Sequence, residues 1–281
     1  MEKIKIITDS TVDLPKELLR ELDIEVMPVL INFGEESYLD GIEITPNELF
    51  DKMEKTDVFP TTAQIIPSRF EEIYKKYIDE GYKVLSIIMS SGMSGTYESA
   101  CLAKQMLETD DVYIVDSQTI TAGLGLLVLK AAKLRDSGMN IEEIVEELEK
   151  VKGSIDSSIS FESLDNLVRG GRLPKAVSVV TGLLGIRLIL EVRDGVMSLK
   201  GKVRGNKKAV KKIISDMEEL KPVKDMPVVI VGVGDNREIK DGIIEYLEKN
   251  NIEYIEGPVG CSVSIHSGRQ AIGVFFMSEN Q

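Results

Sequence analysis

The chain has 281 residues, 43% of them hydrophobic and 29% charged, which is typical of a folded globular protein. This length allows one large domain or two of ordinary size. The net charge of −13 argues against nucleic acid as a partner, and no apolar run approaches the roughly 20 residues of a membrane span. Two cysteines are too few for a disulfide scaffold, and no signal-peptide pattern opens the chain, so we expect a cytoplasmic protein.

Strand and helix patterns alternate through the first half of the chain. Strands are expected at residues 4–8, 25–31, 84–89 and 112–115, with helices over 14–22, 97–107 and 121–136. Capping boxes predict further helix starts at Thr45, Ser68 and Asn140. This alternation predicts a parallel sheet with helices on both faces.

Three of these strands end in small acids and hydroxyls. The segments that follow them are Asp9-Ser10-Thr11, residues 90–96 (SSGMSGT) and Asp116-Ser117. Ligands of parallel α/β sheets bind beyond this edge. Residues 90–96 also lead into a helix, where unpaired N–H groups and the helix dipole favour an oxyanion. A simple hydroxyl-rich turn is the alternative explanation.

The pattern is less regular after Gly153, which marks the expected boundary between domains 1–152 and 153–281. Strands are expected at 158–161, 188–192, 228–233 and 252–255, and helices at 206–220 and 239–249. A turn at Gly195 would join 188–192 to 196–200 as a hairpin. The second half is therefore expected to be a separate mixed-sheet α/β domain.

Basic residues concentrate in this second domain. Between Arg169 and Lys212 there are twelve basic residues and two acids, a local charge of +10 that leaves −23 for the rest of the chain. A solvated surface is the ordinary explanation for such charges. The other is a docking patch for an acidic partner or a phosphorylated group.

A Ser-His-Asp triad is one possible use of these residues. Ser94, the single histidine His266, and Asp9 or Asp116 could supply its members. Residues 92–96 (GMSGT) depart from the G-x-S-x-G nucleophile elbow at the last position. A serine-dependent esterase or acyl hydrolase using Ser94 with His266 is therefore the alternative function.

Nucleotide and metal sites lack their motifs. The sequence contains no G-x-x-x-x-G-K-[ST], and no G-x-G-x-x-G follows the first strand. One histidine and scattered acids give no metal-ligand cluster, so we expect neither metal nor cofactor. The remaining hypothesis is anion capture without chemistry, in which Thr61-Thr62 with Ser94 and Gly95 hold a carboxylate through neutral donors.

Seven short motifs, spread over residues 8–268, occur in an order that resembles the DegV family of bacterial lipid-binding proteins. They are residues 8–15 (TDSTVDLP), 60–64 (PTTAQ), 90–97 (SSGMSGTY), 115–117 (VDS), 164–172 (LDNLVRGGR), 202–209 (KVRGNKKA) and 266–268 (HSG). The resemblance implies a two-domain α/β protein that binds one long-chain fatty acid in a buried apolar tunnel. It also implies a binding subunit that is not itself an enzyme and that presents the carboxylate to a separate ATP-dependent fatty acid kinase subunit.

The same resemblance assigns site residues by position. Thr61 or Thr62 and Ser94 would bind the carboxylate, beside the Gly95 N–H of the anion-capture hypothesis. Arg172, Arg204 and His266 would lie near the head group or on the surface that docks the partner. The chain departs from the family pattern at Ala63, at Ile65-Ile66, at Leu188 and at Arg269-Gln270, and Arg269 is expected to add a positive charge near the head group.

Overall fold

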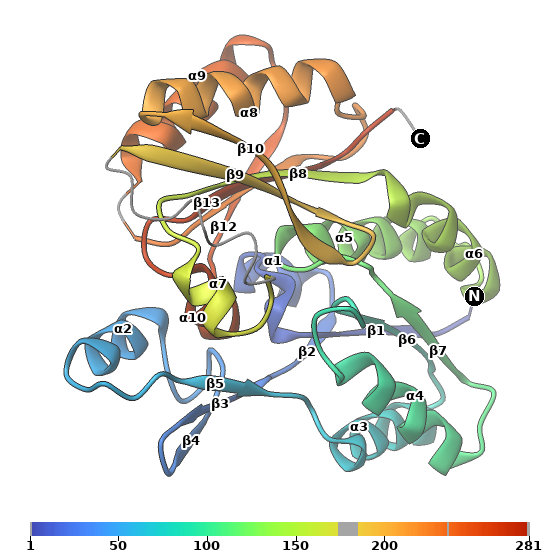
Figure 1. The fold of residues 1–281 in the computed structure, drawn as a ribbon. Coiled ribbons are helices and arrows are strands. Elements are labelled where there is room, and N and C mark those ends of the chain that lie inside the picture. Colours follow the sequence, from blue (N-terminus) through green and yellow to red (C-terminus); the bar gives the residue numbers. More distant parts are fainter. Residues whose placement is uncertain (1, 174–184, 235, 280–281) are drawn as a thin grey trace.

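The computed structural model describes residues 2–173, 185–234 and 236–279 (Figure 1). Within these residues the strands form three sheets. The first is a four-stranded parallel sheet of order β2-β1-β6-β7, built from β1 (Ile4–Asp9), β2 (Ile24–Met27), β6 (Lys83–Ile88) and β7 (Val112–Asp116). Every residue of β1 is buried, as expected of a strand covered on both faces. The predicted parallel α/β architecture is confirmed.

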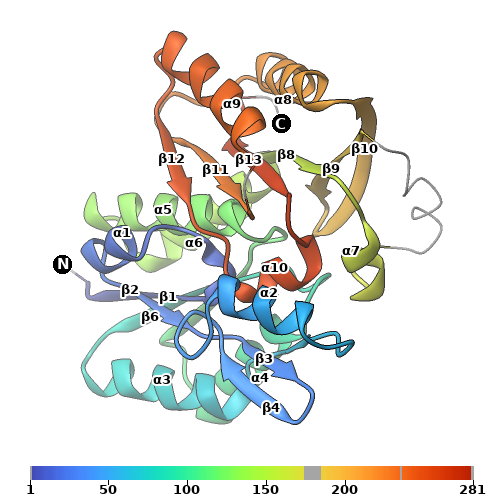
Figure 2. The same cartoon turned by 90° about the vertical axis from the view of Figure 1, so that its left-hand side faces the viewer.

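Helices cover both faces of this sheet (Figures 1 and 2). On one face, α3 and α4 pack against each other and against β6; on the other lie α5 and α6. The helices of this part are α1 (Lys16–Glu21), α2 (Pro46–Glu54), α3 (Pro67–Asp79), α4 (Thr96–Leu107), α5 (Ala122–Asp136) and α6 (Ile141–Val151). Residues 122–128 of α5 are all buried, because this helix lies between the parallel sheet and the second sheet.

The second sheet has six strands in the order β10-β9-β8-β13-β11-β12. They are β8 (Ile155–Phe161), β9 (Ile186–Arg193), β10 (Val196–Arg204), β11 (Val228–Gly232), β12 (Tyr254–Gly257) and β13 (Ile272–Met277). Only β11 and β12 pair in parallel, so the predicted mixed sheet is confirmed, as is the hairpin at Gly195. Side chains alternate across β9: Ile189 packs under α8 (Asn206–Leu220) and α9 (Arg237–Lys249), and Leu188 and Leu190 face the other way.

A third sheet was not predicted. It is antiparallel, of order β4-β3-β5, and consists of β3 (Leu30–Phe33), β4 (Glu36–Leu39) and β5 (Thr61–Ala63). The single strand expected over 25–31 was therefore wrong in extent: β2 and β3 belong to different sheets. Pro28 lies between them and has no N–H to donate to a ladder, which explains why the strand does not continue.

Two of the three predicted capping boxes are present. Thr45 and Asn140 each cap a helix and receive a reciprocal bond from the glutamate three residues later. The box at Ser68 was wrong, because α3 begins at Pro67 with Ile66 as its N-cap. The short helices α7 (Asp165–Arg169) and α10 (Cys261–Ser267) and the 3-10 turns η1 (Ser10–Val12) and η2 (Lys152–Ser154) were not predicted.

One hydrophobic core extends through both halves of the chain. It joins side chains of β1, such as Ile6, to side chains of β8 and β13, such as Phe161 and Phe275. The proposed boundary between residues 152 and 153 falls within η2 and stays a prediction. None of the helices in the described ranges is long and apolar enough to cross a membrane.

Candidate functional site

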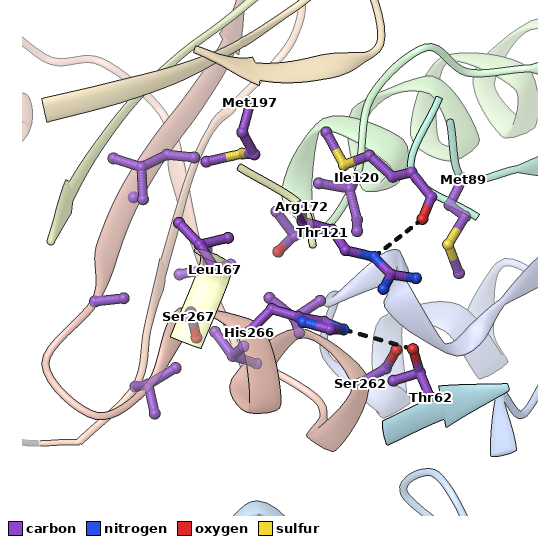
Figure 3. A pocket seen from close by; sticks show the side chains of 18 of the residues that line it. Thr62, Met89, Ile120, Thr121, Leu167, Arg172, Met197, Ser262, His266 and Ser267 are labelled. Atoms are coloured by element: carbon purple, nitrogen blue, oxygen red, sulfur yellow. Dashed lines mark hydrogen bonds between the residues drawn. The ribbon is translucent and has the colours of Figure 1, made fainter. Parts of the chain in front are cut away.

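A pocket of about 220 Å³ lies between the carboxyl edge of the parallel sheet and the inner face of the mixed sheet. Its walls are mainly apolar, and they come from both halves of the chain (Figure 3). Representative wall residues are Met89, Ile120, Phe161, Leu167, Met197 and Phe275. The position agrees with the expectation that a ligand binds beyond the strand ends.

Polar side chains gather in one part of this pocket. Thr62 of β5 and His266 of α10 face each other, with 3.5 Å between Thr62 Oγ1 and His266 Nε2 (Figure 3). Thr61 is exposed and does not line the pocket, because successive residues of β5 point to opposite sides. Of the two predicted threonines, the structure therefore brings only Thr62 to the site.

His266 is held as a neutral imidazole. Burial, with a contribution from the Arg172 charge, lowers its pKa to about 4. Its Nδ1 is buried without a hydrogen-bond partner among the described residues. We therefore assign the ring proton to Nε2, so that the imidazole donates toward Thr62 and the pocket.

Gly170 allows the imidazole to occupy this place. A Cβ built on Gly170 would overlap Nδ1 and lie 2.6 Å from Cε1 of His266. Gly170 follows α7, which packs against α10. The first of the two glycines in the LDNLVRGGR motif is therefore required for steric reasons.

Arg172 brings a positive charge to the pocket. Its Nη1 donates to Gly170 O at 2.6 Å and its Nε donates to Met93 O at 3.3 Å. Figure 3 shows the guanidinium and the His266 imidazole extending in the same direction. Within the described parts of the chain, no carboxylate forms an ion pair with Arg172. An anionic ligand group could provide that charge balance.

The hydroxyl-rich loop between β6 and α4 has a structural part and a part that lines the pocket. Ser90 Oγ donates to Gly195 O at 2.6 Å, which docks the tip of the β9–β10 hairpin, and Ser91 Oγ donates to Asp116. Ser94 lines the pocket; its Oγ lies 2.9 Å from Thr96 Oγ1 and accepts from Thr96 N at 3.3 Å. Only the second part of the loop is therefore placed to meet a ligand.

Gln64 is a pocket residue that the sequence reasoning missed. Its Nε2 donates to Ser99 Oγ at 3.0 Å, and its amide lies so close to Gly95 that a Cβ there would overlap Oε1. Gly95 also lines the pocket. The signal was present, because Gln64 belongs to the PTTAQ motif that supplied the two threonines.

The contacts of a hydrolase triad are not made. Ser94 Oγ bonds to Thr96 and His266 Nε2 faces Thr62, so the proposed nucleophile and base have other partners. The two candidate acids are also engaged elsewhere. Asp9 accepts bonds from Thr11 and Met89, and Asp116 accepts bonds from Ser91 and Gln118. Across the described residues, the geometry gives a serine hydrolase no support.

Two predicted arginines lie away from the pocket. Arg204 is exposed at the end of β10 and is not a lining residue, so of the two proposed roles only partner docking remains open to it. Arg269 was expected near the head group. Its guanidinium instead stacks on Phe50 at 4.6 Å, and its Nη2 lies 3.0 Å from Glu54 Oε1. Both partners belong to α2, so the side chain of Arg269 packs against this helix and not in the pocket.

The structure shows where the other residues that depart from the family pattern lie. Ala63 lines the pocket, and Ile65 is buried in the core. Leu188 is also buried and pairs with Lys202 in the β9–β10 ladder. Gln270 adopts a φ of 76°, a left-handed conformation that favours glycine.

The chain is similar over nearly its whole length to proteins of one family. The sequence model described as an uncharacterised protein of the DegV family matches residues 3–279. A DegV domain-containing protein of Clostridium perfringens is 53% identical over 279 residues, which cover 99% of this chain and 100% of the relative.

Solved structures share the architecture. A DegV family protein from Thermus thermophilus, described for its fatty acid binding, matches with a TM-score of 0.91 at 31% identity and covers 98% of this chain and 99% of its own. DegV of Bacillus subtilis, described as a fatty acid binding protein, matches with a TM-score of 0.84 at 30% identity, with coverages of 99% and 100%. These likenesses define an α/β protein of the DegV fold. The chain belongs to the DegV family.

Proposed function

We propose that this protein binds a long-chain fatty acid, with the hydrocarbon tail among the apolar walls of the pocket and the carboxylate at its polar end. The proposal rests on one observation: the pocket is lined mainly by apolar side chains, and its hydrogen-bonding side chains lie together in one part of it. The fatty acid binding described for the Thermus thermophilus and Bacillus subtilis proteins supports it.

The tail supplies most of the affinity in this proposal. Burying a chain of about 14 methylenes at ~0.8 kcal/mol each contributes about 11 kcal/mol before the costs of association. Each charge-assisted hydrogen bond to the carboxylate adds about 1.5–3 kcal/mol. The polar end therefore orients the ligand, and the apolar walls hold it.

Four groups are assigned to the carboxylate. Thr62 and Ser94 donate through hydroxyls, the Gly95 region offers backbone N–H, and His266 donates through Nε2–H. Arg172 balances the charge from the same side as His266. This set differs from a clamp of neutral donors alone, because a guanidinium faces the pocket.

The carboxylate is presented, in this proposal, to a separate ATP-dependent kinase subunit that forms the acyl-phosphate. The absence of a nucleotide-binding motif from the sequence supports a division of labour between two chains. Exposed cations such as Lys202, Arg204 and Lys207 offer a docking surface for an acidic partner. The protein itself is assigned no catalysis, and the proposal places it in the cytoplasm, where ATP is available.

A titration that varies only the head group tests the proposal. Purified, delipidated protein is titrated with palmitate and with hexadecanol, which keeps the tail and lacks the carboxylate. We expect a thermal shift with both and a lower dissociation constant for palmitate, by at least tenfold. A protein that shows no thermal shift with palmitate does not have this function.

A further inference from the structure

The TDSTVD segment (residues 8–13), which spans the end of β1 and the 3-10 turn η1, supplies no residue to the pocket wall, although most of its polar side chains are buried. Asp9 and Asp13 come from it, and Asp40, which follows β4, lies close by; their exposed fractions are 0%, 4% and 3%. No lysine or arginine among the described residues forms an ion pair with any of the three. Desolvation by burial raises the pKa of all three carboxyls.

Two of these carboxyls cap helix α10. Asp40 Oδ1 accepts from Cys261 N at 2.8 Å, and Asp40 Oδ2 accepts from Ser262 N at 3.1 Å. Asp13 Oδ1 accepts from Gly260 N at 2.8 Å. The N-cap residue of α10 is Gly260, which has no side chain to serve as a cap. The N–H groups at this helix start are therefore satisfied by residues more than 200 positions earlier in the sequence.

Helix α10 is also the element that carries His266. Ser262, Val263 and His266 of this helix line the pocket, and α10 lies beside α2 between the two large sheets (Figure 2). The other oxygen of Asp13 accepts from Thr121 Oγ1 at 2.5 Å, and Thr121 lines the pocket too. The two carboxyls thus stand directly behind one wall of the site.

A second hollow lies on their far side. A groove of about 430 Å³ is lined by Ser10, Asp13, Asp40 and Gly260. Val259 borders both this groove and the pocket. The carboxyls and the start of α10 therefore form a partition between the two hollows, and the hydrogen bonds across it determine where α10 can lie.

We propose that Asp40 and Asp13 are positioning residues for the head-group site: by capping α10 from the first half of the chain, they hold His266 where its Nε2–H meets the ligand carboxylate. This inference rests on the proposed fatty acid binding. It gives the TDSTVD motif a role that acts through His266 and does not involve contact with the ligand.

The two carboxyls differ in a way that an amide substitution reveals. Both oxygens of Asp40 face backbone N–H groups, so the NH2 of Asp40→Asn must point at one of them. Asp13 instead faces one N–H and one hydroxyl. Asp13→Asn keeps both bonds, because the Thr121 hydroxyl can accept from the new NH2. Asp40→Asn should therefore displace α10, and Asp13→Asn should not.

The readout is specific because His266 is the only histidine in the sequence. In protein labelled with 15N-histidine, the two imidazole signals report one side chain. We expect Asp40→Asn to shift these signals and to raise the dissociation constant for palmitate about tenfold. Asp13→Asn should leave the imidazole signals in place, and Asp13→Ala, which removes the acceptor of Gly260 N, should shift them. Asn140→Ala, which removes the cap of the distant helix α6, controls for the loss of a helix cap in general.

A double-mutant cycle separates positioning from general destabilisation. In the His266→Gln background, Asp40→Asn should change the dissociation constant by less than about twofold, since the residue acts through His266. An equal effect in both backgrounds would overturn the proposal. So would imidazole signals that stay at their wild-type positions in Asp40→Asn. If Asp40→Asn does not fold, Ser10→Ala, which removes the third donor to Asp40, must produce a smaller shift of the same signals.

Different results would refute the proposed fatty acid binding and the positioning role of the two carboxyls. If wild-type protein binds no palmitate, the proposed function is wrong. The imidazole signals still test the inference in that case: they must move in Asp40→Asn and stay in Asp13→Asn, and the opposite pattern refutes it.

Discussion

Replacing Gly170 by alanine tests the placement of His266 through a single methyl group. The new Cβ would overlap Nδ1 and lie 3.1 Å from Asn166 O, so it lies between the imidazole and the backbone of α7. The backbone conformation itself suits alanine, since φ at Gly170 is −78°. Of the two neighbours of the new Cβ, the His266 side chain can rotate more easily than the α7 backbone can move. We therefore expect the imidazole to turn away from Thr62.

The cost follows from the hydrogen bond that is lost. If His266 no longer donates to the carboxylate, binding weakens by about 1.5–3 kcal/mol, which corresponds to a dissociation constant raised by roughly 10–150-fold. The assay is a palmitate titration of delipidated protein, with circular dichroism to show that the fold is kept. Gly153→Ala is the matched control, because nothing lies within 4 Å of a Cβ at that position. Unchanged affinity in Gly170→Ala would refute the role given to His266.

Three further changes probe the site and the fold. Ser94→Ala should weaken palmitate binding by about 1–3 kcal/mol with the fold intact, and measurable p-nitrophenyl ester turnover by wild-type protein that this variant abolishes would favour a hydrolase instead. Gln270→Gly should raise the free energy of unfolding in urea by about 1 kcal/mol, because it relieves a φ of 76°; a lower value would show that the side chain contributes more than the strain costs. His266 has a pKa of about 4 in the folded protein against 6.5, so its stabilising effect is present above pH 6.5 and is lost as the pH falls toward 4. Between pH 7 and pH 5 this amounts to about 2 kcal/mol of unfolding free energy, and His266→Gln should remove that part of the pH dependence.

Local patterns predicted the elements whose causes are local. The buried strand β1, the capping boxes at Thr45 and Asn140, and the hairpin at Gly195 each depend on residues within a few positions of one another. The parallel sheet followed from the alternation of such elements. These parts of the fold needed no knowledge of distant contacts.

The elements that were missed depend on partners far away in the sequence. Helix α10 has a start that is satisfied by Asp13 and Asp40, which no window around residue 261 contains. The choice between Thr61 and Thr62 depends on how β5 pairs with β3, and that pairing belongs to a sheet that was not predicted. Arg204 and Arg269 were assigned by motif position alone, and the side chains of both lie away from the pocket.

The most direct test of fatty acid binding is to identify what the native protein carries. The protein is purified without added lipid, denatured, extracted with organic solvent and analysed by mass spectrometry. The proposal predicts a long-chain fatty acid in an amount approaching one per protein chain, and a strongly reduced amount from Gly170→Ala but not from Gly153→Ala. An extract without any long-chain acid, from protein that also fails to bind added palmitate, would contradict it.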